Sequence, residues 1–312
     1  MGSYFDGSQP GPFGGDPRAS GRGQGASGGT PSGFLGLQTS SFTDFLASHS
    51  PGLLPGRVVP AAPADPGVPG QAIRDLPHAT TIVAAVCDGG VVLAGDRRAT
   101  AGNMIAKRDV EKVFRSDEFS GMGYAGTGSV GIEFVRLFQV ELEHYEKMEG
   151  RSLSLEGKAN RLAFMVRGNL AAAMQGLVVV PLFVGYDPEE GGRIVNYDAT
   201  GGRYDEHLGF NAVGSGSIFA KSALKKTYDP SADLAGAVRT AVGALYDAAD
   251  DDTATGLPDL TRGLYPIVVS ITGAEGAVKR PTAEIEAVVR SIVAERTQSA
   301  STGNAATPDA GA

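Results

Sequence analysis

The chain has 312 residues and a mass of 32.0 kDa, with 20% charged residues and a formal net charge of −8. That length suffices for one large domain or two small ones. A mean hydropathy of −0.06, without any apolar run of about 18 residues, argues against a membrane-spanning helix. An acidic sequence without a block of Lys or Arg predicts binding neither to nucleic acid nor to a membrane surface.

The first residues also bear on the compartment. They lack the basic flank and the apolar core of a secretory signal. The one cysteine, Cys87, cannot form an intramolecular disulfide. We therefore expect a soluble, cytoplasmic protein.

The two ends of the chain differ in composition from its middle. Residues 1–79 are rich in Gly, Pro, Ser and Ala and bury too little apolar surface to offset the entropy cost of ordering, so we expect them to be flexible. Within them, residues 33–54 form an apolar island. It is either a short docking helix with Ser41 or Thr43 as N-cap, or an apolar stretch of linker. Residues 298–312 are expected to be a disordered tail.

Residues 80–297 have the composition of a folded domain. Apolar, β-branched runs around Asp88-Gly89-Gly90 predict a β-hairpin, and apolar residues three and four apart later in the chain predict amphipathic helices. The predicted strands are 80–96 (a pair), 112–116, 119–126, 177–187, 193–200, 211–213 and 264–272. The predicted helices are 129–149, 155–175, 217–227, 232–249 and 282–296.

This order of elements is typical of an α+β fold, because paired helices separate the groups of strands and alternating βαβ units are absent. Two antiparallel sheets covered by helices on both outer faces satisfy it. We therefore predict a four-layer αββα sandwich.

One glycine motif suggests a different class of protein. Residues 126–131 read Gly-Thr-Gly-Ser-Val-Gly, a G-x-G-x-x-G motif between a predicted strand and a predicted helix, as in a dinucleotide site. Such a site needs the helix to lead into a parallel strand that ends in an acidic residue, whereas here a second helix follows. A dinucleotide-dependent oxidoreductase is therefore the last of the alternatives.

The common catalytic constellations are missing. The sequence has no G-x-S-x-G motif and no C-x-x-C motif. His49, His78, His144 and His207 do not have the spacing of metal ligands. We therefore expect no histidine-supported nucleophile, no metal and no cofactor.

The junction between the flexible segment and the first strand is a candidate site. A cut between Ala79 and Thr80 would give Thr80 a free α-amine with a pKa of roughly 7.7 to 8.0, so that nucleophile and general base would be one residue. Such a site also needs a fixed cation and a carboxylate, for which Lys112 and Asp96 are candidates. Taken alone, Lys112 is either a stem that reaches to solvent, the commoner case, or a buried charge with a partner.

Several runs together resemble one family. They are TTIV, GDRRAT, the lysine before VF, YAGTG, AVGSGS and DDDTATG. Over residues 80 to about 296 they resemble the 20S proteasome β-subunit, particularly the actinobacterial type. The resemblance implies the N-terminal-nucleophile αββα fold and a threonine-type endopeptidase, with residues 1–79 as a propeptide removed by autocleavage between Ala79 and Thr80.

The resemblance also implies roles for individual residues. Thr80 would be the nucleophile and the N–H of Gly126 the oxyanion donor. The full implied catalytic set is Thr80, Asp96, Lys112, Gly126, Ser215, Asp252 and Thr255. The implied substrate-binding residues, whose small and aliphatic walls favour apolar substrate side chains, are Ala99, Thr100, Val110 and Ile132.

The implied partners are proteasome α-subunits, other β-subunits in stacked heptameric rings, a ring-shaped ATPase and proteins tagged with a ubiquitin-like modifier. Two positions depart from the family pattern. Thr255 stands where serine is usual and keeps the hydroxyl. Ala79 stands where glycine usually precedes the nucleophile, and its restricted backbone predicts slower processing.

Two more alternatives remain. The first is a non-catalytic β-type subunit that only builds the ring, and the presence of the whole implied catalytic set argues against it. The second is another N-terminal-nucleophile hydrolase acting on small amides, against which the GSGS and DDDTATG runs argue.

Overall fold

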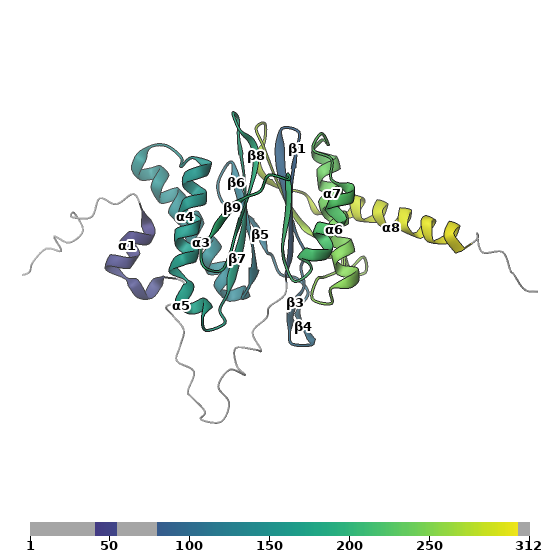
Figure 1. The fold of residues 1–312 in the computed structure, drawn as a ribbon, viewed down its shortest axis with the longest axis horizontal. Helices are drawn as coiled ribbons and strands as arrows, with labels where there is room; N and C mark the ends of the chain where they lie inside the picture. Colours follow the sequence, from purple (N-terminus) through teal and green to yellow (C-terminus); the bar gives the residue numbers. More distant parts are fainter. Residues whose placement is uncertain (1–40, 55–79, 305–312) are drawn as a thin grey trace, which may run out of the picture. The chain divides into compact units, whose positions relative to one another are not determined.

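The computed structural model describes residues 41–54 and 80–304, and within them two five-stranded antiparallel sheets pack face to face (Figure 1). The first sheet has the order β10-β1-β2-β11-β12. Its strands are β1 (Thr81–Cys87), β2 (Gly90–Gly95), β10 (Phe210–Gly214), β11 (Ile267–Thr272) and β12 (Gly276–Lys279). The second sheet contains β5 (Val113–Arg115), β6 (Ser120–Gly126), β7 (Val179–Asp187), β8 (Gly191–Tyr197) and β9 (Arg203–Asp205), in that order.

Helices cover the outer face of each sheet (Figure 1). The second sheet is covered by α3 (Gly128–Glu149), α4 (Leu155–Gly168) and the short α5 (Leu170–Ala173). The first sheet is covered by α6 (Ser217–Thr227), α7 (Leu234–Asp251) and α8 (Thr282–Asn304). The predicted four-layer αββα sandwich is confirmed.

The central strands β1, β2, β6 and β11 bury both of their faces, which explains why strands such as β1, β2 and β11 read as nearly continuous apolar runs. In β1, Val83 and Cys87 pack against the layer of α6 and α7, while Ile82 and Ala84 point into the core between the sheets. Successive side chains of a strand point to opposite faces, so one apolar run serves two cores. Each fully buried aliphatic side chain stabilises the fold by roughly 1.5 to 3 kcal/mol.

Several element boundaries differ from the predictions. The predicted helix 155–175 is interrupted at Asn169, whose φ of −88° and ψ of 0° depart from helical geometry and which separates α4 from α5. The short strands β9 and β12 and the hairpin of β3 (Ala99–Ala101) and β4 (Met104–Lys107) were not predicted. Three or four residues are too few to show a periodic pattern.

The last helix is longer than predicted. α8 continues to Asn304, whereas a disordered tail was expected from residue 298. Residues 298–302 contain neither Gly nor Pro, and extending an existing helix adds one hydrogen bond for each residue fixed. The rest of the expected tail, 305–312, lies outside the described residues.

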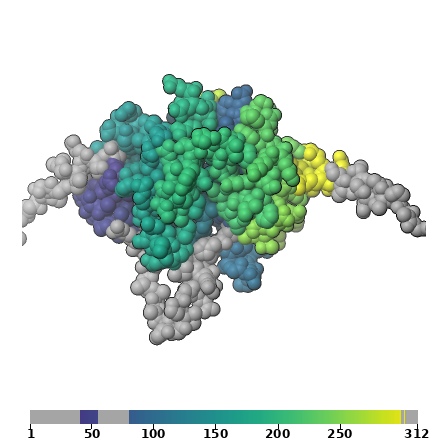
Figure 2. Space-filling model, in the orientation of Figure 1, coloured from purple at the N-terminus to yellow at the C-terminus, as the bar shows by residue number. Residues whose placement is uncertain are grey.

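The apolar island contains a helix in its described part, residues 41–54. These residues form α1 (Phe42–His49) and the 3-10 turn η1 (Pro51–Leu53). The side chain of Ser41 accepts a hydrogen bond from Asp44 N at 3.0 Å, so Ser41 is the N-cap and the docking-helix alternative is confirmed for this part. Figure 2 shows this segment, in purple, against the teal surface of α3 and α4. The rest of the expected flexible segment, 1–40 and 55–79, lies outside the described residues.

A buried carboxylate holds α1 in place. Glu141 of α3 is 2% exposed and accepts hydrogen bonds from both Thr43 N (2.6 Å) and Thr43 Oγ1 (2.7 Å). Its other oxygen forms an ion pair with Arg161 Nε of α4 at 2.7 Å. Thr43 is therefore not the cap of α1 but the residue that connects it to α3.

None of the helices within the described ranges is long and apolar enough to cross a membrane.

Candidate active site

Thr80 immediately precedes β1, which lies between β10 and β2 in the first sheet. It is buried, and its carbonyl accepts a hydrogen bond from Ser215 N at 3.0 Å, which continues the pairing of β1 with β10. Thr80 lines a cavity of about 400 Å³. Residue 79, the other half of the predicted cleavage site, lies outside the described residues.

Asp96 and Lys112 form a buried ion pair beside Thr80. Lys112 Nζ lies 2.7 Å from Asp96 Oδ1, and the two side chains are 1% and 0% exposed. Lys112 Nζ also donates to the carbonyl of Arg98. Lys112 is therefore a buried charge with a partner, and the alternative of a stem reaching to solvent is wrong.

Backbone amides complete the surroundings of the Asp96 carboxylate. Its Oδ1 accepts from Thr81 N at 2.8 Å, and its Oδ2 accepts from Arg98 N and Gly256 N, both at 2.9 Å. A buried carboxylate is stable only when its lone pairs are satisfied in this way. Burial lowers the pKa of Lys112 below its ordinary 10.5, and the charge of Asp96 partly opposes that effect.

A second cluster lies where α7 ends. Asp252 is the C-cap of α7, and its Oδ2 accepts hydrogen bonds from Ser215 Oγ and Thr255 Oγ1, both at 2.6 Å. Thr255 is fully buried. The preceding acidic residues, Asp250 and Asp251, are exposed, as predicted for a solvated helix end.

Two of the three glycines at 126–131 have structural reasons of their own. Gly126 has a φ of +117°, and a Cβ there would lie 2.1 Å from the carbonyl oxygen of Val178. A Cβ on Gly131 would lie 2.2 Å from the ring of Tyr124. Because β6 pairs antiparallel with both β5 and β7 and α3 leads into α4, the dinucleotide fold is excluded.

The cavity beside Thr80 brings together most of the predicted site. Its lining includes Thr80, Lys112 and Gly126 together with the predicted pocket residues Ala99, Val110 and Ile132. Thr100, the fourth predicted substrate-binding residue, is not among the lining residues and follows Ala99 on β3. The lining residues that sequence reasoning missed are Lys107, Tyr124, Thr127, Gly128 and Ser129.

Tyr124 closes part of this cavity. Its hydroxyl donates to the carbonyl of Gly128 at 3.2 Å, and burial raises its pKa to about 12. In the sequence Tyr124 alternates with Met122 on one face of a strand, and this pattern is the same as that of a core residue. The sequence therefore held no signal that separates it from the core.

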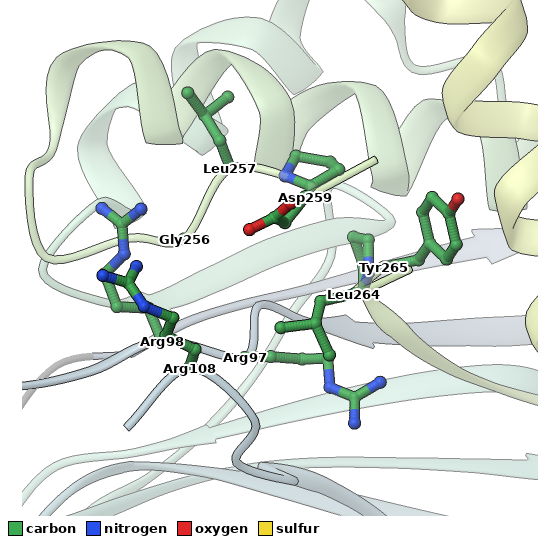
Figure 3. A pocket seen from close by; sticks show the side chains of 10 residues that line it. Arg97, Arg98, Arg108, Gly256, Leu257, Asp259, Leu264 and Tyr265 are labelled. Carbon is green, nitrogen blue, oxygen red and sulfur yellow. The ribbon is translucent and has the colours of Figure 1, made fainter. Parts of the chain in front are cut away.

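A smaller cavity of about 40 Å³ borders the residues that hold Asp96 (Figure 3). Arg97, Arg98 and Arg108 line it on one side, and Leu257 and Asp259 line it on the other. The guanidinium of Arg98 donates to Thr253 O at 3.0 Å, next to Asp252 in the chain. Arg98 thus connects the Asp96 carboxylate to the residue after Asp252, and its only sequence signal was the resemblance of GDRRAT.

No group of His, Cys, Asp and Glu residues suited to a metal ion occurs within 41–54 and 80–304. His144 packs against the ring of Phe42, with centroids 5.7 Å apart. Cys87 is a free, buried thiol, and burial raises its pKa to about 11.

Comparison with known proteins agrees with this geometry. A family model described as "Proteasome subunit" matches residues 76–258. The chain is 56% identical to Proteasome subunit beta of Saccharomonospora viridis over 273 residues. The aligned region covers 86% of this chain and 94% of that protein. It is 59% identical over 271 residues to Proteasome subunit beta 1 of Rhodococcus erythropolis and to Proteasome subunit beta of Rhodococcus jostii, each covering 85% of this chain and 92% of the relative.

The four-layer αββα sandwich is the fold of the N-terminal-nucleophile hydrolases, and here Thr80 lies at the start of a strand beside the buried Lys112. The chain belongs to the proteasome subunit family. Within that family it is of the β type, the proteolytic subunit with threonine peptidase activity.

Proposed function

We propose that Thr80 is the nucleophile of this peptidase and that it becomes active when the chain cuts itself between Ala79 and Thr80. The observation that carries the proposal is that Thr80, Lys112 and Gly126 line one cavity, with Lys112 held there by a fully buried Asp96. Residues 1–79 would then be the propeptide of a zymogen, and the catalytic domain would begin at Thr80 and include all of α8.

The first reaction is the cleavage of the chain itself. Thr80 Oγ attacks the carbonyl carbon of Ala79, and the Cα-attached nitrogen of Thr80 leaves that carbon, so that the acyl group moves from N to O. Water then hydrolyses the ester, which returns the hydroxyl to Thr80 and releases residues 1–79 with a new carboxylate. The new α-amine of Thr80 is a base with a pKa of roughly 7.7 to 8.0 before its surroundings act on it.

The second reaction is the hydrolysis of substrate. The amine of Thr80 takes the proton from its own hydroxyl as Oγ attacks the peptide carbonyl, and it returns the proton to the leaving amine. The N–H of Gly126 stabilises the oxyanion. Water then attacks the acyl-enzyme and regenerates Thr80, and no cofactor takes part.

The two clusters would act on the same amine. The ammonium of Lys112 disfavours a second positive charge nearby, so it lowers the pKa of the amine and keeps the base neutral at physiological pH. Ser215, Asp252 and Thr255 would orient the amine and form a path for its proton. The hydroxyl that Thr255 shares with the usual serine suits this role.

The apolar walls supplied by Ala99, Val110 and Ile132 favour apolar substrate side chains before the cut, with Thr100 bonding the substrate backbone. A panel of fluorogenic peptides with basic, acidic and apolar residues at that position tests this preference. Fastest cleavage of the basic peptides would contradict it.

As a β-type subunit the chain assembles with proteasome α-subunits and with other β-subunits. We infer that it forms heptameric rings whose nucleophiles face a closed chamber, in the cytoplasm. A ring-shaped ATPase would deliver proteins tagged with a ubiquitin-like modifier. Enclosure fits a protease of this kind, because a pocket with small apolar walls excludes few proteins by itself.

Replacement of the nucleophile tests the proposal. Thr80→Ala particles should keep residues 1–79 by intact mass and should cleave no fluorogenic peptide, whereas Thr80→Ser, which retains a hydroxyl, should process and cleave more slowly than the natural chain. Loss of residues 1–79 from purified Thr80→Ala by its own action would contradict the mechanism.

A further inference from the structure

Thr81, the residue after the proposed nucleophile, contacts both clusters of the site. Its N–H donates to Asp96 Oδ1 at 2.8 Å. Its Oγ1 lies 2.6 Å from Thr255 Oγ1 and accepts a hydrogen bond from Gly216 N at 3.0 Å. The side chain is fully buried, so these contacts are shielded from water.

The hydrogen-bond partners fix the direction of the short hydroxyl contact. Thr255 Oγ1 donates its one proton to Asp252 Oδ2, so it can only accept from Thr81. Thr81 Oγ1 is therefore the donor in the 2.6 Å contact and the acceptor from Gly216. A series of hydrogen bonds therefore runs from the Gly216 amide through the hydroxyls of Thr81 and Thr255 to the Asp252 carboxylate. Ser215 Oγ donates to the same carboxylate at 2.6 Å.

Packing alone would not require a hydroxyl at this position. Alternation along β1 places Thr81 on the same face as Val83 and Cys87, both of which lie in the apolar core beneath α6 and α7. Valine has the same shape as threonine, and an apolar residue here would match its neighbours. The hydroxyl of Thr81 instead forms hydrogen bonds with Gly216, in the loop after β10, and with Thr255, in the loop after α7.

The loop after β10 approaches so closely that no side chain fits between. A Cβ on Gly216 would lie 2.6 Å from both Thr81 Oγ1 and Thr255 Oγ1. The hydroxyl of Thr81 is thus in direct contact with the backbone of Gly216, the residue after Ser215. Without it, the buried Gly216 amide would lose its acceptor and Thr255 would lose the donor that directs its proton.

We propose that Thr81 is a positioning residue, whose hydroxyl orients Thr255 and through it the Ser215–Asp252 pair while its amide holds Asp96. This inference rests on the proposed function, because the orientation matters only if Thr80 is the nucleophile. Thr81 acts through Thr255 and Asp252 and does not touch the substrate.

The test compares Thr81→Val, which removes the hydroxyl and keeps the shape, with Thr81→Ser, which keeps the hydroxyl. Fluorogenic peptide hydrolysis by assembled particles is measured for each. We expect Thr81→Val to lower kcat about tenfold or more with little change in KM, since a lost buried hydrogen bond is worth about one decade in rate. Thr81→Ser should restore kcat to within about threefold of the natural chain.

Val83→Ala is the matched control, because it weakens the same face of β1 without touching a hydroxyl. Its thermal unfolding should shift downwards while kcat stays near that of the natural chain. A double-mutant cycle adds a readout that packing would not move: in a Thr255→Val background, Thr81→Val should cause little further loss. If Thr81→Val does not assemble, Thr81→Cys, whose thiol is a weak donor, should give an intermediate kcat.

Three results would overturn the proposal: natural kcat in Thr81→Val, a loss in Thr81→Ser as large as in Thr81→Val, or additive losses in the cycle. The proposed function has a separate readout. If Thr80→Ala stays inactive while Thr81→Val behaves as the natural chain, only the role of Thr81 fails. If Thr80→Ala still processes and cleaves, the nucleophile itself is wrong.

Discussion

The buried Lys112 affects both the stability of the fold and, in the proposed mechanism, the processing of the chain. Replacing it with methionine would leave the carboxylate of Asp96 buried without its counter-charge, and breaking a buried pair in this way destabilises a protein by about 3 to 5 kcal/mol. We expect Lys112→Met to lower the denaturation midpoint strongly and to leave residues 1–79 attached by intact mass.

Lys107→Met is the control for that variant. Lys107 lines the same cavity but is exposed, so its replacement should change the unfolding free energy by less than about 0.5 kcal/mol and should permit processing. Equal destabilisation by the two variants would contradict the account of the buried pair.

The lowered pKa of Lys112 predicts opposite effects of alkaline pH on stability and activity. Between its folded pKa and the ordinary 10.5, the unfolded chain binds more protons than the folded chain, so the contribution of Lys112 to stability rises with pH. Its positive charge is lost over the same range. As the pH is raised, we expect peptidase activity to be lost before pH 10.5 is reached, while circular dichroism shows the fold intact. A loss of activity that coincides with unfolding would contradict this.

Residue types in the site could be predicted, but their contacts could not. The need for a cation and a carboxylate singled out Lys112 and Asp96, and the structure places them in one ion pair. The run TTIV includes Thr81, but the resemblance assigned it no role, because its partners, Gly216 and Thr255, are far along the chain from the proposed nucleophile. Contacts across such separations depend on the pairing of β1 with β10, which no local pattern encodes.

Among the elements, the turn from β6 into α3 depends strongly on backbone conformation. Gly126→Ala would place a Cβ 2.1 Å from Val178 O at a φ of +117°, a strained conformation that costs of order 1 to 3 kcal/mol. We expect lower stability and lost peptidase activity in this variant. Gly128→Ala, two residues away in the same cavity lining, meets no atom within 4 Å and should be tolerated. Thermal unfolding and peptide hydrolysis of both variants measure the contrast.

The attachment of α1 depends on one threonine. Thr43→Val removes the Oγ1 donor to buried Glu141 but keeps the amide contact. We expect amide hydrogen exchange in α1 to become about tenfold faster, because one hydrogen bond to a charged group is lost. Ser48→Ala, whose hydroxyl is exposed on the same helix, should leave exchange nearly unchanged. Equal rates in the two variants would show that Glu141 does not hold α1.

Long, periodic elements were predicted closely, whereas their interruptions were not. Apart from the short β9, the strands and helices from β6 to α7 follow their apolar periods to within a few residues, because each buries a continuous face. The break at Asn169 and the extension of α8 to Asn304 depend on local hydrogen bonding and on the absence of a breaker, which periodicity does not register.

At the scale of the whole molecule, composition separated the Gly-rich first quarter from the folded domain, and the order of elements predicted the sandwich. What composition could not provide is the connection between them: a helix from the first quarter lies on α3 and α4, held by Glu141 and Arg161. If the chain is cut before Thr80, this helix loses its covalent link to the domain. Its attachment would then depend on these contacts alone.

Self-processing of the chain can be tested directly by the intact mass of this subunit in peptidase-active particles isolated from its own host. We expect a chain that begins at Thr80, with residues 1–79 removed. A full-length chain in particles that cleave peptides would contradict it, because Thr80 would then have no free amine.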